Sequence, residues 1–209
     1  MKTEIQKYKL KIVLEGELID LCEPSEYYAL NSDWYNWQND PDLVRYISTR
    51  GHNNNTPKEQ LNFYKQALKN RILYIVSNKK EYLGVVNFSG INKIYNESNL
   101  ALLINYKKDL INSPMISLEA VARMTELGFE KYALTKISSG HHPDLIGWNQ
   151  RKELLGYRLN GINPEGFKKG SEIKDTYASS ILRDDYFTLK YTRGGKLWDS
   201  AELMLNRIK

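Results

Sequence analysis

The chain has 209 residues, 41% hydrophobic and 26% charged, so it can bury a core and is not a disordered polypeptide. The net charge is +5, but Lys and Arg occur singly or in pairs, which argues against a nucleic-acid-binding arm while suiting an anionic small ligand. The single cysteine, Cys22, excludes an internal disulfide. No stretch approaches the roughly 20 apolar residues of a membrane span, so we expect a cytoplasmic protein without membrane contacts.

In the first half of the chain, hydrophobic periodicity predicts an interrupted strand, two helices and three further strands. In chain order these are a strand over 10–21 broken at Gly16, helices over 26–38 and from 56 onward, and strands over 73–77, 82–88 and 100–104. The second helix has the strongest start signal, because Thr56 can cap it, Pro57 suits its first position and Glu59 completes a capping box.

In the second half, helices and strands alternate. In chain order we expect a helix over 114–129, a strand over 136–139, a helix over 146–155, strands over 157–159 and 177–189, and a helix over 196–208. The segment 161–174 contains Pro and Gly and is predicted to be a loop. This order predicts a mixed, mostly antiparallel α/β (α+β) sheet with helices on both faces, formed by a domain over 1–192 with a C-terminal helical extension over 193–209.

Three segments carry a family resemblance. The first is Trp-Tyr-Asn-Trp-Gln-Asn-Asp-Pro-Asp-Leu-Val-Arg-Tyr over 34–46, and the second is Leu-Gly-Val-Val-Asn over 83–87. The third is His-Pro-Asp-Leu over 142–145 followed by Glu-Leu-Leu-Gly-Tyr-Arg-Leu-Asn-Gly over 153–161. In this order and spacing the chain resembles the GNAT acyl-CoA N-acyltransferase superfamily over about residues 8–190, in particular the branch that acetylates ribosomal-protein N-termini and amino sugars. The resemblance implies a GNAT-like fold and transfer of an acetyl or short acyl group from acetyl-CoA to a primary amine, without a metal.

The family holds its coenzyme at a glycine-rich loop before a helix, where free amides and the positive end of the helix dipole meet the pyrophosphate. The matching loop here is 112–117, where Met115 and Ser117 replace the glycines and Pro114 lacks an N–H. An ordinary helix start capped by Ser113, with no ligand, fits the same residues. The expected cofactor contacts are Leu103, Ile104, Asn112, Ser113, Met115, Ile116, Ser117 and Asn149, and Lys107 and Lys108 could neutralise phosphates.

Direct acyl transfer needs a base for the amine and an acid for the leaving thiolate. The adjacent His141 and His142 follow a predicted strand and are the first candidates for the base, since imidazole titrates near neutral pH. Glu97, the carboxylate nearest the fourth strand, is the second. The family's acid position holds Lys152, so Tyr157 is a candidate acid, with Tyr106 and Tyr95 as alternatives.

The early helices and the loop after them are expected to bind the acceptor, with Trp34, Arg45, Tyr46 and His52 as lining residues. The preferred acceptor is a small amine such as a nucleotide-linked amino sugar, and a protein N-terminus is the second choice. The alternative is a catalytically inactive GNAT-fold protein that binds a ligand or partner. A homodimer formed through the C-terminal helix is a further open alternative.

Overall fold

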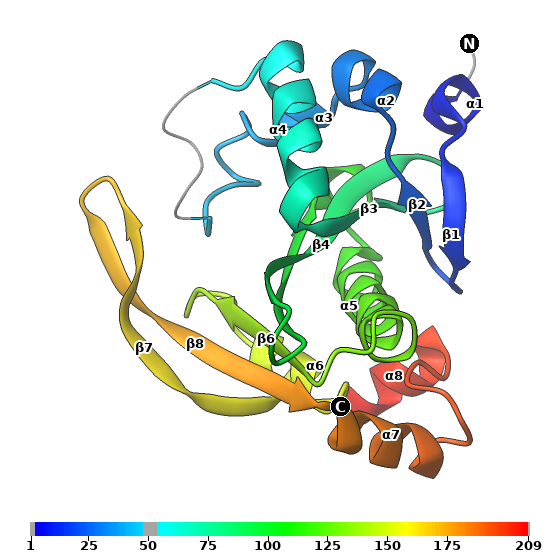
Figure 1. The fold of residues 1–209 in the computed structure, drawn as a ribbon, viewed down its shortest axis with the longest axis vertical. Coiled ribbons are helices and arrows are strands. Elements are labelled where there is room, and N and C mark those ends of the chain that lie inside the picture. The colour runs from blue at the N-terminus through cyan, green and yellow to red at the C-terminus, as the bar shows by residue number, and fades with distance from the viewer. Residues whose placement is uncertain (1–2, 48–53, 209) are drawn as a thin grey trace.

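The computed structural model describes residues 3–47 and 54–208, and within them eight strands form one sheet (Figure 1). The strands are β1 (Lys11–Glu15), β2 (Asp20–Glu23), β3 (Ile72–Ser77), β4 (Tyr82–Asn92), β5 (Glu97–Ile104), β6 (Lys136–His141), β7 (Arg158–Lys169) and β8 (Glu172–Leu182). Their spatial order is β1-β2-β3-β4-β5-β6-β8-β7. All neighbours are antiparallel except β5 and β6, which confirms the predicted mixed, mostly antiparallel sheet.

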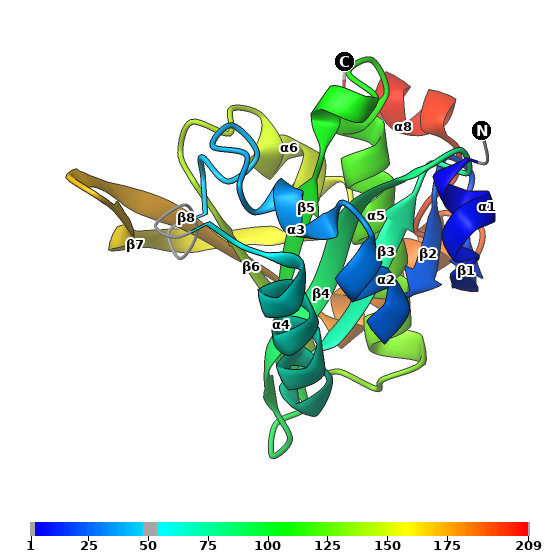
Figure 2. The ribbon, with the colours of Figure 1, turned by 90° about the horizontal axis from the view of Figure 1, so that it is seen from above.

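Helices cover both faces of this sheet, as predicted (Figures 1 and 2). They are α1 (Glu4–Tyr8), α2 (Glu26–Asn31), α3 (Trp34–Trp37), α4 (Pro57–Asn70), α5 (Ser113–Glu130), α6 (Trp148–Glu153), α7 (Arg183–Thr192) and α8 (Ala201–Ile208), with a 3₁₀ turn over Tyr106–Lys108. The predicted capping box of α4 is present, with Thr56 and Glu59 bonding each other's backbone N–H. None of the helices described is both long and apolar enough to cross a lipid bilayer.

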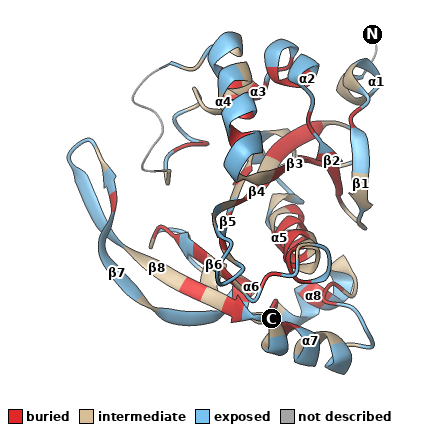
Figure 3. Cartoon of the chain, in the orientation of Figure 1, coloured by how far each residue is buried: buried red, intermediate tan, exposed pale blue. Residues whose placement is uncertain are grey.

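Two apolar cores lie on opposite sides of the sheet (Figure 3). The larger one packs α5, through residues such as Val121 and Phe129, against the central strands, and it includes Trp198 and Met204 from the C-terminal segment. The smaller one packs α2, α3 and α4 against the other face and includes Trp34. The C-terminal segment therefore packs into the main core, and its Trp198 donates through Nε1 to Glu17 at 2.8 Å.

Two predictions for the first half of the chain are wrong in detail. The stretch 10–21 is not one interrupted strand, because the chain reverses after β1 and β2 pairs back antiparallel to it. The helix predicted over 26–38 is two helices, since α2 ends at Asn31 and Ser32 turns out of the helix to accept from the backbone N–H of Trp34. Ser25 caps α2, as predicted.

The largest correction concerns 161–174, which is not a loop but the outer part of the long β7–β8 hairpin (Figures 1 and 2). Pro164 and Gly166 are accommodated in a bulge, where the pairing register shifts between Asn163 and Phe167. The hairpin turns at Gly170, whose φ of +59° lies in the left-handed region that favours glycine. Turn-forming residues inside a strand therefore mark a bulge here.

Helix boundaries in the second half also differ from the prediction. The strand predicted to run to residue 189 ends at Leu182, and α7 follows with Asp184 and Asp185 in its first turn, where carboxylates stabilise a helix. The helix predicted over 146–155 is shortened to α6, and the one predicted over 196–208 is shortened to α8.

The sheet opens between β5 and β6. These parallel strands pair only through their first three residues, the last pair being Asn99 with Ser138. Beyond it β5 still pairs with β4 as far as Ile104, and β6 still pairs with β8 as far as His141. The two strands therefore diverge and leave a gap in the middle of the sheet.

Candidate active site

One wall of the gap is the edge of β5 that has left β6. Beyond Asn99 the β6-facing backbone of β5 has no strand partner, so its peptide groups are available to an extended ligand. Leu103 is buried toward the α2–α4 core and Ile104 packs against the α5 core, so the side chains of both residues are engaged in packing and only their backbone remains for a ligand. On the opposite edge of β5, Gly84 lets β4 approach closely, because a Cβ there would lie 2.6 Å from the Leu103 carbonyl oxygen.

At the start of α5, beside the gap, backbone and side-chain donors already bond to another residue of the chain. The N-cap of α5 is Asn112, not Ser113 as predicted. The carboxylate of Asp109 accepts from the backbone N–H and from the side-chain amide of Asn112, at 3.2 and 3.1 Å. The Asp109 carbonyl oxygen also accepts from the N–H of Ser113 at 3.0 Å. The Asp109 carboxylate thus accepts from donors at the helix start, where the family resemblance implies that a coenzyme phosphate would bind.

Few backbone donors remain in the first turn of α5. Pro114 has no N–H, and the N–H of Ile116 donates to the Asn112 carbonyl oxygen at 2.9 Å. The amide of Met115 has no partner among the described residues, so it is the donor left for an anion. Ser117 lies one residue further into the helix.

The two lysines considered for the phosphates are already paired. Lys107 Nζ lies 2.8 Å from carboxylate oxygens of Asp40 and Asp42, and its hydrogen bond to Asp40 is the main cause of its raised pKa. Lys108 Nζ lies 3.1 Å from Glu4 and donates to the Tyr82 carbonyl oxygen. Phosphates would have to compete with these carboxylates.

The other wall of the gap ends in a buried polar cluster. His141 is the last residue of β6, and its Nδ1 lies 3.2 Å from Nζ of Lys152 on α6. Lys152 is 1% exposed, and its amine also contacts the carbonyl oxygen of Ser139 and the hydroxyl of Ser179. Burial lowers the pKa of Lys152 to about 8. Burial, with Lys152 and then His142 as further causes, lowers the pKa of His141 to about 4.

His142 lies in a separate, aromatic environment. Its ring is 4.8 Å from that of Tyr46 and 4.6 Å, edge-on, from that of Phe167. Its Nδ1 accepts from the backbone N–H of Asp144, so in the neutral ring the proton is on Nε2. That Nε2 is buried without a hydrogen-bond partner and lies 3.7 Å from a carboxylate oxygen of Glu172.

The β7–β8 hairpin brings part of the predicted acceptor site to His142. Lys169 Nζ donates to the Val44 carbonyl oxygen at 2.6 Å, which ties the hairpin to the turn that carries Tyr46. Arg45 is exposed and lies over the Tyr46 ring at 5.3 Å. Trp34 is 1% exposed in the smaller core, so its ring is not available for stacking on an acceptor. His52 lies outside the described residues.

The remaining predicted residues lie away from the gap. Glu97 pairs with Lys136 at the end of β5 and β6 where the strands still meet. Tyr157 is in the main core with its hydroxyl bonded to that of Thr125, and burial raises its pKa. Asn149 is half-buried in the first turn of α6.

Both alternative acids are solvent-exposed. Tyr95 lies in the β4–β5 turn and Tyr106 lies in the 3₁₀ turn after β5.

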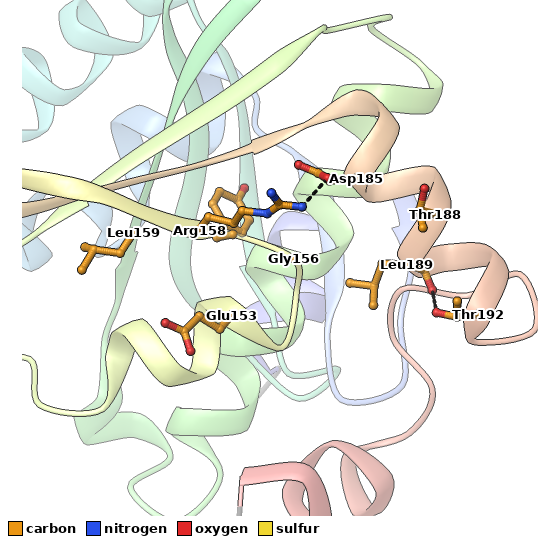
Figure 4. A pocket seen from close by; sticks show the side chains of 9 residues that line it. Glu153, Gly156, Arg158, Leu159, Asp185, Thr188, Leu189 and Thr192 are labelled. Carbon is orange, nitrogen blue, oxygen red and sulfur yellow. Dashed lines mark hydrogen bonds and ion pairs between the residues drawn. The ribbon is translucent and has the colours of Figure 1, made fainter.

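One pocket lies away from the gap between β5 and β6. A hollow of about 530 Å³ lies between the start of β7 and α7, and the ion pair of Arg158 with Asp185 lies at it (Figure 4). Its lining residues are Glu153, Gly156, Tyr157, Arg158, Leu159, Asp185, Thr188, Leu189 and Thr192. Neither histidine of the gap nor the start of α5 contributes to it, so we do not assign the site there.

Two residues define this region although neither was predicted as a site residue: Lys152, noted only as a departure from the family's acid position, and Asp109. Lys152 lies four residues after Trp148 and three before Leu155, which is the spacing of a buried helix face. Because lysine is rarely buried, a lysine at this position is a signal in the sequence that points to a special role. Asp109 gives no such signal, because its role depends on the turn that folds back before α5.

Comparison with known proteins identifies the fold. No family model matches the sequence, and no curated protein matches it. Three of the matching solved structures are a spermidine N-acetyltransferase from Vibrio cholerae with CoA and spermine, a ribosomal-protein-S5-alanine acetyltransferase from Vibrio fischeri, and a GNAT-family acetyltransferase from Bacillus anthracis. Their TM-scores are 0.72, 0.69 and 0.62, at 16%, 18% and 18% identity. The matches cover 82%, 83% and 84% of this chain and 99%, 97% and 98% of theirs. The chain therefore has the fold of the GNAT acetyltransferases, as its sequence resemblance predicts.

Proposed function

We propose that the protein transfers an acetyl or short acyl group from coenzyme A to a primary amine. The observation that carries the proposal is the divergence of β5 from β6. The unpaired edge of β5 offers peptide groups to the amides of a pantetheine arm, and the facing end of β6 holds the imidazole of His141 near the place where a thioester would lie. The fold, shared with acetyltransferases of which one was solved with CoA, supports the same reading.

The coenzyme phosphates would meet the start of α5. The Met115 amide, the positive end of the helix dipole and the Ser117 hydroxyl are the groups available there. The contacts of Asp109 with Asn112 must open for the phosphates to approach closely. We therefore propose acetyl-CoA as the co-substrate, in a pose that displaces the Asp109 carboxylate.

For the acceptor we propose a small cationic amine. The partly exposed carboxylates of Asp144 and Glu172 flank His142, and the Tyr46 ring lies beside it. Carboxylates and an aromatic face attract an ammonium group and repel phosphates. This favours a polyamine-like acceptor over the nucleotide-linked amino sugar expected from the sequence, with a protein N-terminus as the second choice.

An acceptor panel tests this proposal. Purified protein is incubated with acetyl-CoA and spermidine, glucosamine or an alanine-starting peptide, and free thiol and product mass are measured. We expect saturable, acceptor-dependent thiol release and a singly acetylated product, with spermidine the best of the three. Absence of acetylated product from all three, at millimolar acceptor, contradicts the proposal.

One observation favours a second function. At the start of α5, where a coenzyme phosphate would bind, the Asp109 carboxylate accepts from the N–H of Asn112, and Pro114 lacks an N–H that could donate to a phosphate. A GNAT-fold protein that has lost coenzyme binding and serves as a ligand- or partner-binding protein would have this feature. Such a protein would show no acetyl-CoA binding in solution, whereas the proposed enzyme binds it.

A further inference from the structure

Lys152 is a buried lysine without a carboxylate. Among residues 3–47 and 54–208 no Asp or Glu lies within ion-pair distance of its Nζ, although the side chain is 1% exposed. Instead its three donor positions match three acceptors, namely the Ser139 carbonyl oxygen, the Ser179 hydroxyl and Nδ1 of His141. Removing an amine from water is costly, so a buried lysine with no counter-charge calls for an explanation beyond packing.

The hydrogen bonds fix which nitrogen of His141 carries the proton. The Ser179 hydroxyl donates to the Ser139 carbonyl oxygen at 3.0 Å, so its lone pairs are free to accept from Lys152. An ammonium group only donates, so Nδ1 of His141 must accept from it. The proton of the neutral imidazole therefore sits on Nε2.

Nε2 of His141 is the ring nitrogen that remains for a ligand. Within the part of the chain that the structure describes, no group bonds Nε2 of His141, and the ring lies three residues past the last β5–β6 pair, where the sheet has opened. The other titratable groups close to it are His142, the next residue, and Tyr177 on β8, whose ring centroid is 5.4 Å away. His141 thus carries an N–H without a partner among the described residues, at the end of β6 past the last β5–β6 pair, and its other nitrogen is held by Lys152.

We propose that Lys152 is a positioning residue that holds His141 as an Nε2–H donor, and that His141 passes a proton from Lys152 to the sulfur leaving the thioester. This inference rests on the proposed acyl transfer. As the amine nitrogen bonds to the acyl carbon, the C–S bond breaks and its electron pair stays on sulfur. The sulfur takes the proton of Nε2 while Nδ1 takes one from the Lys152 ammonium. The products are the thiol, a neutral His141 and a neutral Lys152 amine, and the proton lost by the acceptor nitrogen goes to water.

The electrostatics agree with this geometry. Burial lowers the pKa of His141 to about 4, so the ring does not hold a second proton at neutral pH and would act poorly as the base predicted from the sequence. Burial also lowers the pKa of Lys152 to about 8, close to the roughly 8.5 of a thiol, so proton transfer between them is nearly balanced. The relay needs a charged lysine and a neutral histidine, which these values provide at pH 7.

Nitrogen-15 NMR of the protein without ligand tests the positioning. The three histidines make the imidazole signals assignable with single His variants. We expect wild-type His141 to be the Nε2–H tautomer at pH 7. In Lys152→Met the Nδ1 lone pair loses its donor, so a mixture of tautomers should appear and the His141 pKa should rise. Lys131→Met, at the exposed end of α5, is the matched control and should leave both unchanged. An Nδ1–H tautomer in wild type, or an unchanged His141 signal in Lys152→Met, overturns the inference.

Acetyl transfer tests the proton donation. With whichever acceptor of the panel is turned over, kcat of Lys152→Met should fall about 10²-fold or more while the KM for acetyl-CoA stays within roughly twofold, the pattern of a lost acid. Thermal melting of the variant shows that it is folded. A folded Lys152→Met with wild-type kcat refutes the relay but leaves the proposed function standing. A wild-type protein that transfers no acetyl group refutes both, and the NMR result then still decides the tautomer.

Discussion

Asp109 and Asn112 form a closed contact at the start of α5, in which the carboxylate accepts both the backbone and the side-chain N–H of Asn112. A carboxylate and a phosphate compete for the same donors at a helix start. We expect the contact to stabilise the helix in the free protein and to oppose the proposed binding of coenzyme A, and substitution can separate the two effects.

Asp109→Asn should tighten the binding of coenzyme A. The substitution removes one negative charge from the helix start, which is worth about 0.3–1 kcal/mol and thus roughly two- to fivefold in affinity. Calorimetric titration measures it, with Asp184→Asn in the first turn of α7 as the control for an equal change in net charge. Equal affinities for the two variants would show that Asp109 does not face the coenzyme.

Lys152→Met should change how stability depends on pH. The pKa of Lys152 falls from 10.5 in the unfolded chain to about 8 in the fold, so between these values the unfolded state binds more protons. Wild-type stability should rise with pH over this window by up to about 3 kcal/mol relative to Lys152→Met. Urea unfolding of both proteins from pH 7 to 10 measures the difference. A constant difference across that range would mean that the buried amine does not titrate there.

Phe167→Ala should weaken acceptor binding and leave coenzyme binding unchanged. Phe167 is buried in the β7–β8 hairpin and contacts the His142 ring edge-on at 4.6 Å. We expect the acceptor KM to rise about tenfold, equivalent to about 1.4 kcal/mol. Phe187→Ala on α7, far from His142 in sequence and partly exposed, is the control. A Phe167→Ala protein with an unchanged acceptor KM would remove the hairpin from the acceptor site.

Glu119→Ala should destabilise the fold without touching the site. Glu119 is fully buried in α5, accepts from the backbone N–H of Glu17 and Leu18 at 2.7 Å each, and pairs with Arg123. Its loss leaves two unpaired N–H groups and removes one of the two carboxylate partners of Arg123, the other being Glu126, which costs about 2–5 kcal/mol. Thermal unfolding measures it against the exposed control Glu202→Ala in α8. Similar melting temperatures for the two variants would contradict the role assigned to Glu119.

The sequence predicted the parts of the fold that local chemistry determines. Thr56, Pro57 and Glu59 mark the start of α4 correctly because a capping box needs only neighbouring residues. The β7–β8 hairpin was missed because Pro164 and Gly166 resemble a loop locally, and only pairing with β8 shows that they form a bulge.

The site was predictable only where the family resemblance gave positions. It pointed to the start of α5 and to the histidines at the end of β6. The environments that decide their chemistry come from residues distant in sequence, such as Lys152 for His141 and Phe167 for His142. Burial of Trp34 is likewise a tertiary property, which aromatic residue type alone does not reveal.

Titration calorimetry with acetyl-CoA tests most directly whether the opened sheet and the start of α5 receive a coenzyme. We expect saturable binding of one equivalent per chain with a micromolar dissociation constant, weakened when Met115→Pro removes the remaining free amide of the first turn. Absence of any binding heat at millimolar acetyl-CoA, with the protein folded, would contradict it.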